Sequence, residues 1–171
     1  QNVEIMTEDI FQLMKFLKIN KASFVGFSMG GAVAFQTALL HPENVDKLVI
    51  LNSGPDFNNA KDSGVDILGE RTKIIKEQGF STLAQTISAG MFPEDKQKEW
   101  RDEFEQRIVS NDEDAYLKTF GELMSWGMGE KISEIPHQTL VIASDMDYTP
   151  VNKKKSYTEK MQHAKLVVIE N

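Results

Sequence analysis

Residues 22–33 read Ala-Ser-Phe-Val-Gly-Phe-Ser-Met-Gly-Gly-Ala-Val, and this stretch decides the fold. Its first half, Ala22 to Phe27, is a short apolar run typical of a strand buried in a parallel sheet. From Met29 to about His41, small and apolar residues follow without a breaker, which predicts a helix that Pro42 ends. Ser28 therefore stands at the turn from a strand into a helix.

The pattern Gly26-Phe27-Ser28-Met29-Gly30 suits a serine nucleophile. A sharp turn strains the serine backbone and points its hydroxyl away from the sheet, at a helix N-terminus. The residues two before and two after the serine approach closely, and Gly26 and Gly30 leave that space empty. We predict that Ser28 attacks a carbonyl carbon and that the Met29 N–H faces the resulting oxyanion. The alternative is a glycine-rich turn that only packs a helix on a strand.

The remaining segments alternate between helical and strand patterns. A helix is predicted from about Thr7, where Ile10, Leu13, Met14 and Leu17 share one face. Further strands are predicted at 47–52, 139–143 and 165–169, with a helix at about 152–162. This order predicts an α/β fold whose parallel strands are covered by helices on both faces.

Residues 55–134 differ from their surroundings, because their helical pieces are broken by Gly and Pro. We interpret them as a helical cap inserted into a core made of residues 1–54 and 135–171. Six apolar residues could roof a pocket over the serine or form the cap's own core: Met91, Phe92, Phe120, Met124, Trp126 and Met128. The stretch 126–129 resembles a flexible joint that could gate entry.

Composition excludes several classes of function. The chain has 26 acidic against 19 Lys and Arg residues and a formal charge of -7, so nucleic acid is not an expected partner. It has no cysteine for a disulfide or a thiolate metal site. No apolar run is long enough to span a bilayer, and the N-terminus lacks a signal-peptide pattern. A cytoplasmic protein without membrane contact is expected.

Two separated stretches resemble the α/β-hydrolase superfamily: Val25 to Gly31 followed by His41-Pro42-Glu43-Asn44-Val45-Asp46-Lys47-Leu48-Val49, and Ile135 to Val151. Within it, the chain is similar to bacterial esterases, enol-lactonases and cofactor-free haloperoxidases, whose helical cap is inserted where residues 53–134 lie. The resemblance implies no metal and no organic cofactor. It also places the catalytic acid in the loop after the strand at 139–143.

The resemblance assigns the role of triad acid to Asp147, which would orient a catalytic imidazole. Asp145, two residues earlier, is an alternative that could instead cap the following helix. Asp56, after the strand at 47–52, is a more distant alternative.

The histidine that completes a triad is expected after the last strand. His41, His137 and His163 all precede or close elements at the other end of the sheet. The resemblance therefore implies a base beyond residue 171, and strands before Gln1. Without those preceding strands, residues 22–27 would form a long apolar edge of the sheet. This predicts either a longer polypeptide or a homodimer that pairs through this strand.

We predict a serine hydrolase that acts on small carboxylic esters or lactones, with Ser28, Met29 and Asp147 in the roles given above. The alternative is a protein of the same fold that binds a ligand or a partner without catalysis. It is kept because none of the three histidines is expected at the position of the catalytic base.

Overall fold

A computed structural model of the chain describes residues 1–58 and 66–170. The chain divides into two compact units, residues 1–59 with 125–171, and residues 60–124, which we describe separately. No helix among the described residues is long and apolar enough to cross a membrane.

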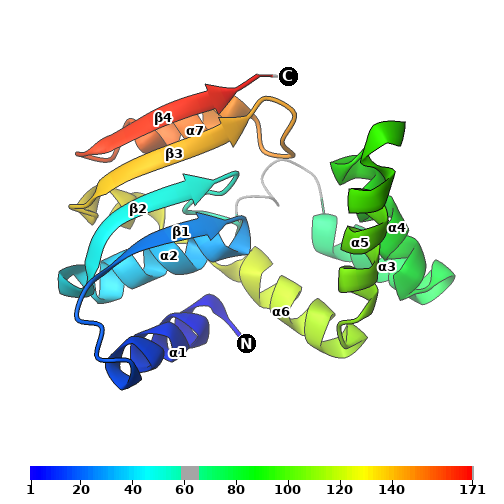
Figure 1. Cartoon of the computed structure of the whole chain (residues 1–171), viewed down its shortest axis with the longest axis horizontal. Coiled ribbons are helices and arrows are strands. Elements are labelled where there is room, and N and C mark those ends of the chain that lie inside the picture. The colour runs from blue at the N-terminus through cyan, green and yellow to red at the C-terminus, as the bar shows by residue number, and fades with distance from the viewer. Residues whose placement is uncertain (59–65, 171) are drawn as a thin grey trace. The chain divides into compact units, whose positions relative to one another are not determined.

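The first unit contains a parallel four-stranded sheet in the order β1-β2-β3-β4 (Figure 1). The strands are β1 Ala22–Phe27, β2 Val45–Leu51, β3 Gln138–Ser144 and β4 Ala164–Ile169. Its helices are α1 Val3–Phe16, α2 Met29–Leu40 and α7 Val151–Thr158, with short 3₁₀ segments η1 Pro42–Asn44 and η4 Gly129–Glu134. The predicted α/β fold with a parallel sheet flanked by helices is confirmed.

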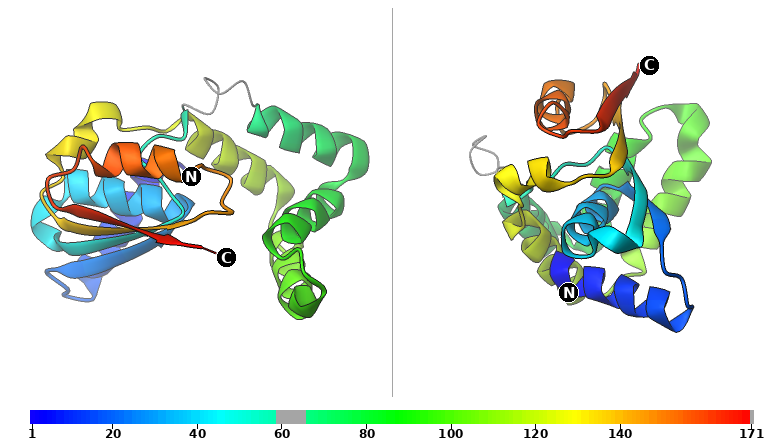
Figure 2. Two further views of the ribbon diagram at one scale, coloured as in Figure 1. Left: turned by 90° about the horizontal axis from the view of Figure 1, so that it is seen from above. Right: turned by 90° about the vertical axis from the view of Figure 1, so that its left-hand side faces the viewer.

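The two crossover helices lie on the same face of the sheet (Figure 2). Phe35 of α2 meets Tyr157 of α7 edge-to-face, with ring centroids 5.9 Å apart. Right-handed crossovers that advance in one direction place their helices on one side. On the other face Val25 is 71% and Phe27 53% exposed. The prediction of strands covered on both faces is therefore wrong for the described residues.

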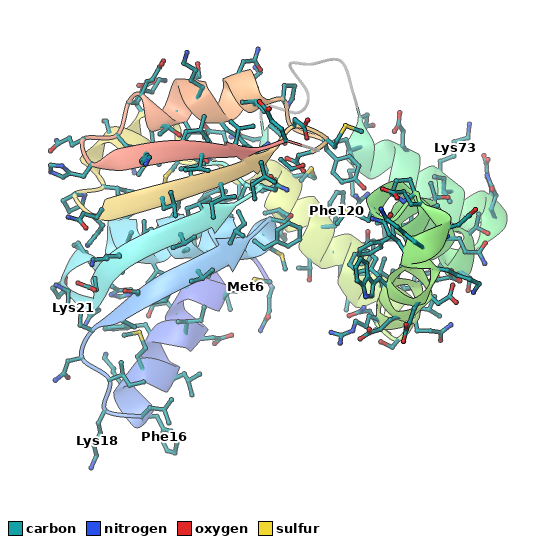
Figure 3. The ribbon with its side chains drawn as sticks, turned by 45° about the horizontal axis from the view of Figure 1, so that its top comes forward. Met6, Phe16, Lys18, Lys21, Lys73 and Phe120 are labelled. Atoms are coloured by element: carbon teal, nitrogen blue, oxygen red, sulfur yellow. The ribbon has the colours of Figure 1, made fainter. Side chains whose placement is uncertain are left out.

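Helix α1 begins earlier than the sequence predicted, because the Asn2 side chain accepts a hydrogen bond from the Ile5 N–H and caps it. Thr7, where the predicted helix starts, is buried within the helix instead. The predicted apolar face is also displaced: Met14 is buried, whereas Leu13 and Leu17 are more than half exposed. Phe16, near the end of the helix, is 82% exposed (Figure 3).

The second unit is helical, with α3 Ile67–Gln78, α4 Phe80–Met91, η3 Asp95–Gln97, α5 Lys98–Val109 and α6 Glu113–Ser125. Gly79, at φ 92°, joins α3 to α4 in a conformation that glycine tolerates. Phe120, marked in Figure 3, stacks on Tyr116, and the Arg71 guanidinium lies over its ring. Phe92 contacts the rings of Trp100 and Phe104. The unit thus has aromatic contacts of its own.

Candidate active site

Ser28 occupies the turn between β1 and α2. Its φ of 49° and ψ of -119° form a backbone conformation that residues with a side chain rarely adopt. The chain is held there because the Ser28 N–H donates to the Leu51 carbonyl across 3.1 Å, which extends the β1–β2 ladder into the turn. Ser28 is half-buried at the carboxyl end of β1, the end at which ligands bind in parallel sheets.

Two glycines make this turn possible, and only one of them is in the predicted pair. A Cβ at Gly26 would lie 2.3 Å from the Gly30 carbonyl oxygen, as expected for a crowded turn. A Cβ at Gly30 would meet nothing within 4 Å, so the steric reason predicted for Gly30 does not hold. The second crowded position is Gly31, where a Cβ would lie 2.5 Å from both Cβ and Oγ of Ser53.

Met29 is the first residue of α2. The first N–H groups of a helix have no acceptor within the helix, and they carry the positive end of its dipole. The Ser28 carbonyl accepts the first bond of the helix, from the Gly31 N–H at 2.9 Å. The Met29 N–H therefore adjoins the Ser28 side chain at the end of the helix that favours an anion.

The buried hydroxyl of Ser53, which the sequence did not indicate, supports this turn. Ser53 Oγ donates to the Ser28 carbonyl oxygen across 2.6 Å, and Ser53 is only 4% exposed. The Tyr157 hydroxyl donates in turn to the Ser53 carbonyl at 3.0 Å. Burial raises the pKa of Tyr157 above its usual range, so this phenol stays protonated and remains a donor.

The carboxyl ends of β2 and β3 are joined by Asn52. Its φ of 41° directs the backbone out of β2, and its N–H donates to the Ile142 carbonyl at 3.0 Å. Its side-chain oxygen accepts a bond from the Ser144 N–H at 2.8 Å. This clamp fixes the start of the loop that carries the candidate acid.

Asp147 lies in the loop between β3 and α7, at the same end of the sheet as Ser28. Its Oδ2 accepts a hydrogen bond from the Thr149 N–H at 3.3 Å and from Lys154 Nζ at 2.6 Å. Its side chain is 12% exposed, whereas the Lys154 side chain is completely buried. The sequence predicted only that Lys154 lies in a helix at about 152–162 and did not indicate this contact.

The two alternative acids have other surroundings. Asp145 is exposed, and its N–H donates to the Ile169 carbonyl at 3.2 Å, which ties the loop to β4. Asp56 Oδ1 accepts from the Gly129 N–H at 2.7 Å, so this carboxylate joins two connecting segments of the first unit.

None of the chain's 3 histidines lies near the carboxyl ends of the strands. His41 follows α2, stacks on Phe11 and pairs through Nε2 with Glu8 Oε1 at 2.8 Å, which links α1 to α2. His137 Nε2 lies 2.8 Å from the Pro42 carbonyl oxygen. His163 is exposed just before β4. The prediction that these histidines lie at the other end of the sheet is confirmed.

The predicted joint at 126–129 is held by hydrogen bonds within the first unit. The Trp126 carbonyl accepts from the N–H groups of Phe57 and Asn58, and the Met128 N–H donates to the Pro55 carbonyl. Trp126 Nε1 donates to Gln36 Oε1 at 3.1 Å. Trp126 and Met128 are 5% and 7% exposed, so both side chains pack in the first unit. The predicted movement of residues 126–129, and gating of entry by it, stays a prediction.

The described part of the chain contains no cluster of side chains suited to a metal ion. Among residues 1–58 and 66–170, no group of three His, Asp or Glu side chains could hold a metal ion.

The chain is similar to known proteins in sequence and in fold. Residues 3–87 match the family model of the alpha/beta hydrolase fold. The chain is 24% identical to a putative carbamate hydrolase, RutD, of Stutzerimonas stutzeri, over 98% of this chain and 64% of that protein. It is 31% identical to a 2-hydroxy-6-oxo-6-phenylhexa-2,4-dienoate hydrolase of Burkholderia cepacia, over 91% of this chain and 57% of that protein.

Among solved structures, the chain is similar to the enol-lactonase from Burkholderia xenovorans LB400. The TM-score is 0.86 and the identity 20%, over 99% of this chain and 65% of that one. The chain thus spans less than two thirds of the length of each of these three proteins.

Proposed function

Because this chain belongs to the α/β-hydrolase superfamily, we propose that it carries the nucleophile and the acid of a serine hydrolase acting on small carboxylic esters or lactones. The observation that carries the proposal is the conformation of Ser28, at φ 49° between a parallel strand and a helix N-terminus. A backbone strained in this way suits a nucleophile rather than a packing turn.

The proposed reaction passes through an acyl-enzyme. Ser28 Oγ attacks the substrate carbonyl carbon while an imidazole oriented by Asp147 removes its proton. The carbonyl oxygen becomes an oxyanion that accepts a hydrogen bond from the Met29 N–H. The imidazolium then gives its proton to the leaving alkoxide, and the ester bond breaks. A water molecule, deprotonated by the same imidazole, attacks the acyl carbon and releases a carboxylic acid and free Ser28.

The substrate class rests on the relatives. Their names state a carbamate hydrolase, a dienoate hydrolase and an enol-lactonase. All three names are those of hydrolases or lactonases, and the same serine chemistry would serve the bond that each of these enzymes cleaves. Small esters and lactones are the substrates that we propose for this chain, without a cofactor.

A second candidate is a binding protein without catalysis. It is favoured by the positions of His41, His137 and His163, since none of them approaches Ser28 or Asp147 from the carboxyl ends of the strands. A serine without its base retains only a small part of its reactivity.

The two candidates differ in turnover. We would assay the purified intact protein with p-nitrophenyl acetate, p-nitrophenyl butyrate and dihydrocoumarin, beside a Ser28→Ala variant whose circular dichroism matches that of the unmodified protein. Hydrolysis that disappears in Ser28→Ala supports the hydrolase. Equal background rates in both proteins, with all three substrates, would contradict it and leave the binding protein.

A further inference from the structure

Lys154 is a buried cation whose contacts converge on the candidate acid. Its side chain is 0% exposed, and its Nζ donates to Asp147 Oδ2 at 2.6 Å and to the Thr149 carbonyl oxygen. Lysine is rarely buried completely, because removing an ammonium group from water is costly unless a partner compensates it. This lysine therefore has a specific partner rather than a general surface role.

The local geometry explains how the contact forms. Lys154 is in the first turns of α7, directly after the loop that holds Asp147 and Thr149. Its ammonium group bridges the carboxylate of one loop residue and the carbonyl of the other. The loop is thereby folded back onto α7. The neighbours Lys153 and Lys155 are exposed, so burial distinguishes Lys154 within the Lys-rich run.

The contacts of Asp147 are one-sided. Both the Lys154 ammonium and the Thr149 N–H bind Oδ2. Among the described residues, Oδ1 has no hydrogen-bond partner. A carboxylate that is anchored through one oxygen can present the other in a fixed direction, and fixed orientation is what a triad acid supplies to its imidazole.

We propose that Lys154 is a positioning residue, which anchors Oδ2 of Asp147 so that Oδ1 faces the catalytic imidazole. This inference rests on the proposed function. It predicts that the lysine affects the reactivity of Ser28 only through Asp147. A lysine that merely closed the loop would change the stability of the fold and nothing specific to the reaction.

The experiment compares labelling rates in the intact protein. We would measure, by mass spectrometry, the rate at which a fluorophosphonate acylates Ser28 in the unmodified protein, Lys154→Met, Asp147→Asn and the double variant. All rates would be taken at a temperature below the melting transition of each protein. Lys153→Met, which removes an exposed charge one residue away, is the matched control.

We expect Lys154→Met to slow labelling on the order of 10- to 100-fold, because misplacement of a catalytic group has effects of this size. Lys153→Met should leave the rate unchanged. In the Asp147→Asn background, Lys154→Met should have no further effect, since the group that it positions is already altered.

Two results would overturn the inference. One is a folded Lys154→Met protein that is labelled at the unmodified rate. The other is that Lys154→Met slows labelling equally in the unmodified protein and in the Asp147→Asn variant. If Lys154→Met does not fold, the comparison of the double variant with Asp147→Asn alone still tests the inference, because a slower double variant contradicts it. An unmodified protein that takes no label would instead contradict the proposed function itself.

Discussion

Ser53 Oγ donates a hydrogen bond to the carbonyl oxygen of Ser28 across 2.6 Å, although the two serines lie 25 residues apart in sequence. Ser53 follows β2, and its own carbonyl accepts a bond from Tyr157 of α7. The strained turn at Ser28 is thus supported from the next strand and from a helix near the C-terminal end. Strained backbone persists where its surroundings fix it in this way.

Ser53→Ala tests this support. We expect the variant to lose about 1 kcal/mol in the free energy of unfolding, the usual net value of a hydrogen bond. We also expect slower labelling of Ser28, because the turn that holds it is less constrained. Urea unfolding and fluorophosphonate labelling measure the two effects. Labelling at the unmodified rate, together with lost stability, would show that the bond supports the fold alone.

The glycines of the turn give a second prediction: alanine at Gly31 and alanine at Gly30 should have different effects on stability. Gly31→Ala places a Cβ 2.5 Å from Ser53, and we expect a loss of about 1–3 kcal/mol in unfolding free energy, typical of overpacking. Gly30→Ala is the matched control, since its Cβ meets nothing within 4 Å and alanine favours a helix. Urea unfolding of both proteins gives the comparison. Equal losses would contradict the steric account.

The choice of acid is tested by two conservative variants. If Asp147 orients the imidazole, Asp147→Asn should reduce the rate of ester hydrolysis on the order of 10³- to 10⁴-fold, as loss of a triad acid does. Asp145→Asn should reduce it less than about tenfold, since that exposed residue would have no part in the reaction. Steady-state kinetics below the melting transition provide the measurement. The reverse order of effects would assign the role to Asp145.

The free side of β1 leads to a prediction about association. β1 pairs with β2 and with no other described strand, so it forms an edge of the sheet. Val25 and Phe27 on this strand are more than half exposed. We expect a polypeptide of residues 1–171 to form dimers through this edge, and Val25→Lys to weaken them, because charge disfavours edge pairing. Light scattering after size-exclusion chromatography would measure the mass of both proteins and so the fraction of dimer. A monomer at all concentrations would contradict the proposal.

Local patterns in the sequence were sufficient for the parallel sheet and for the turn at Ser28. The apolar run at 22–27 and the breaker-free run after it each specify one element, and Gly26 marks the close approach between them. The same reasoning placed Asp147 in the loop between β3 and α7. These features depend on neighbours in sequence, which periodicity and turn chemistry describe well.

The remaining features depend on distant contacts. Ser53 and Tyr157 lie 104 residues apart, and no local pattern indicates that they meet. Lys154 appears in sequence as one of three consecutive lysines, and only the fold shows which of them is buried. Gly31 likewise needs to be glycine because of Ser53, a residue of another strand end. Long-range packing decided each case.

Activation of Ser28 as a nucleophile is tested most directly by the intact mass of the fluorophosphonate-treated protein. We expect the purified intact protein to gain the mass of one label, the label to map to Ser28, and Ser28→Ala to gain none. A folded protein that takes no label, or one that is labelled equally after Ser28→Ala, would contradict it.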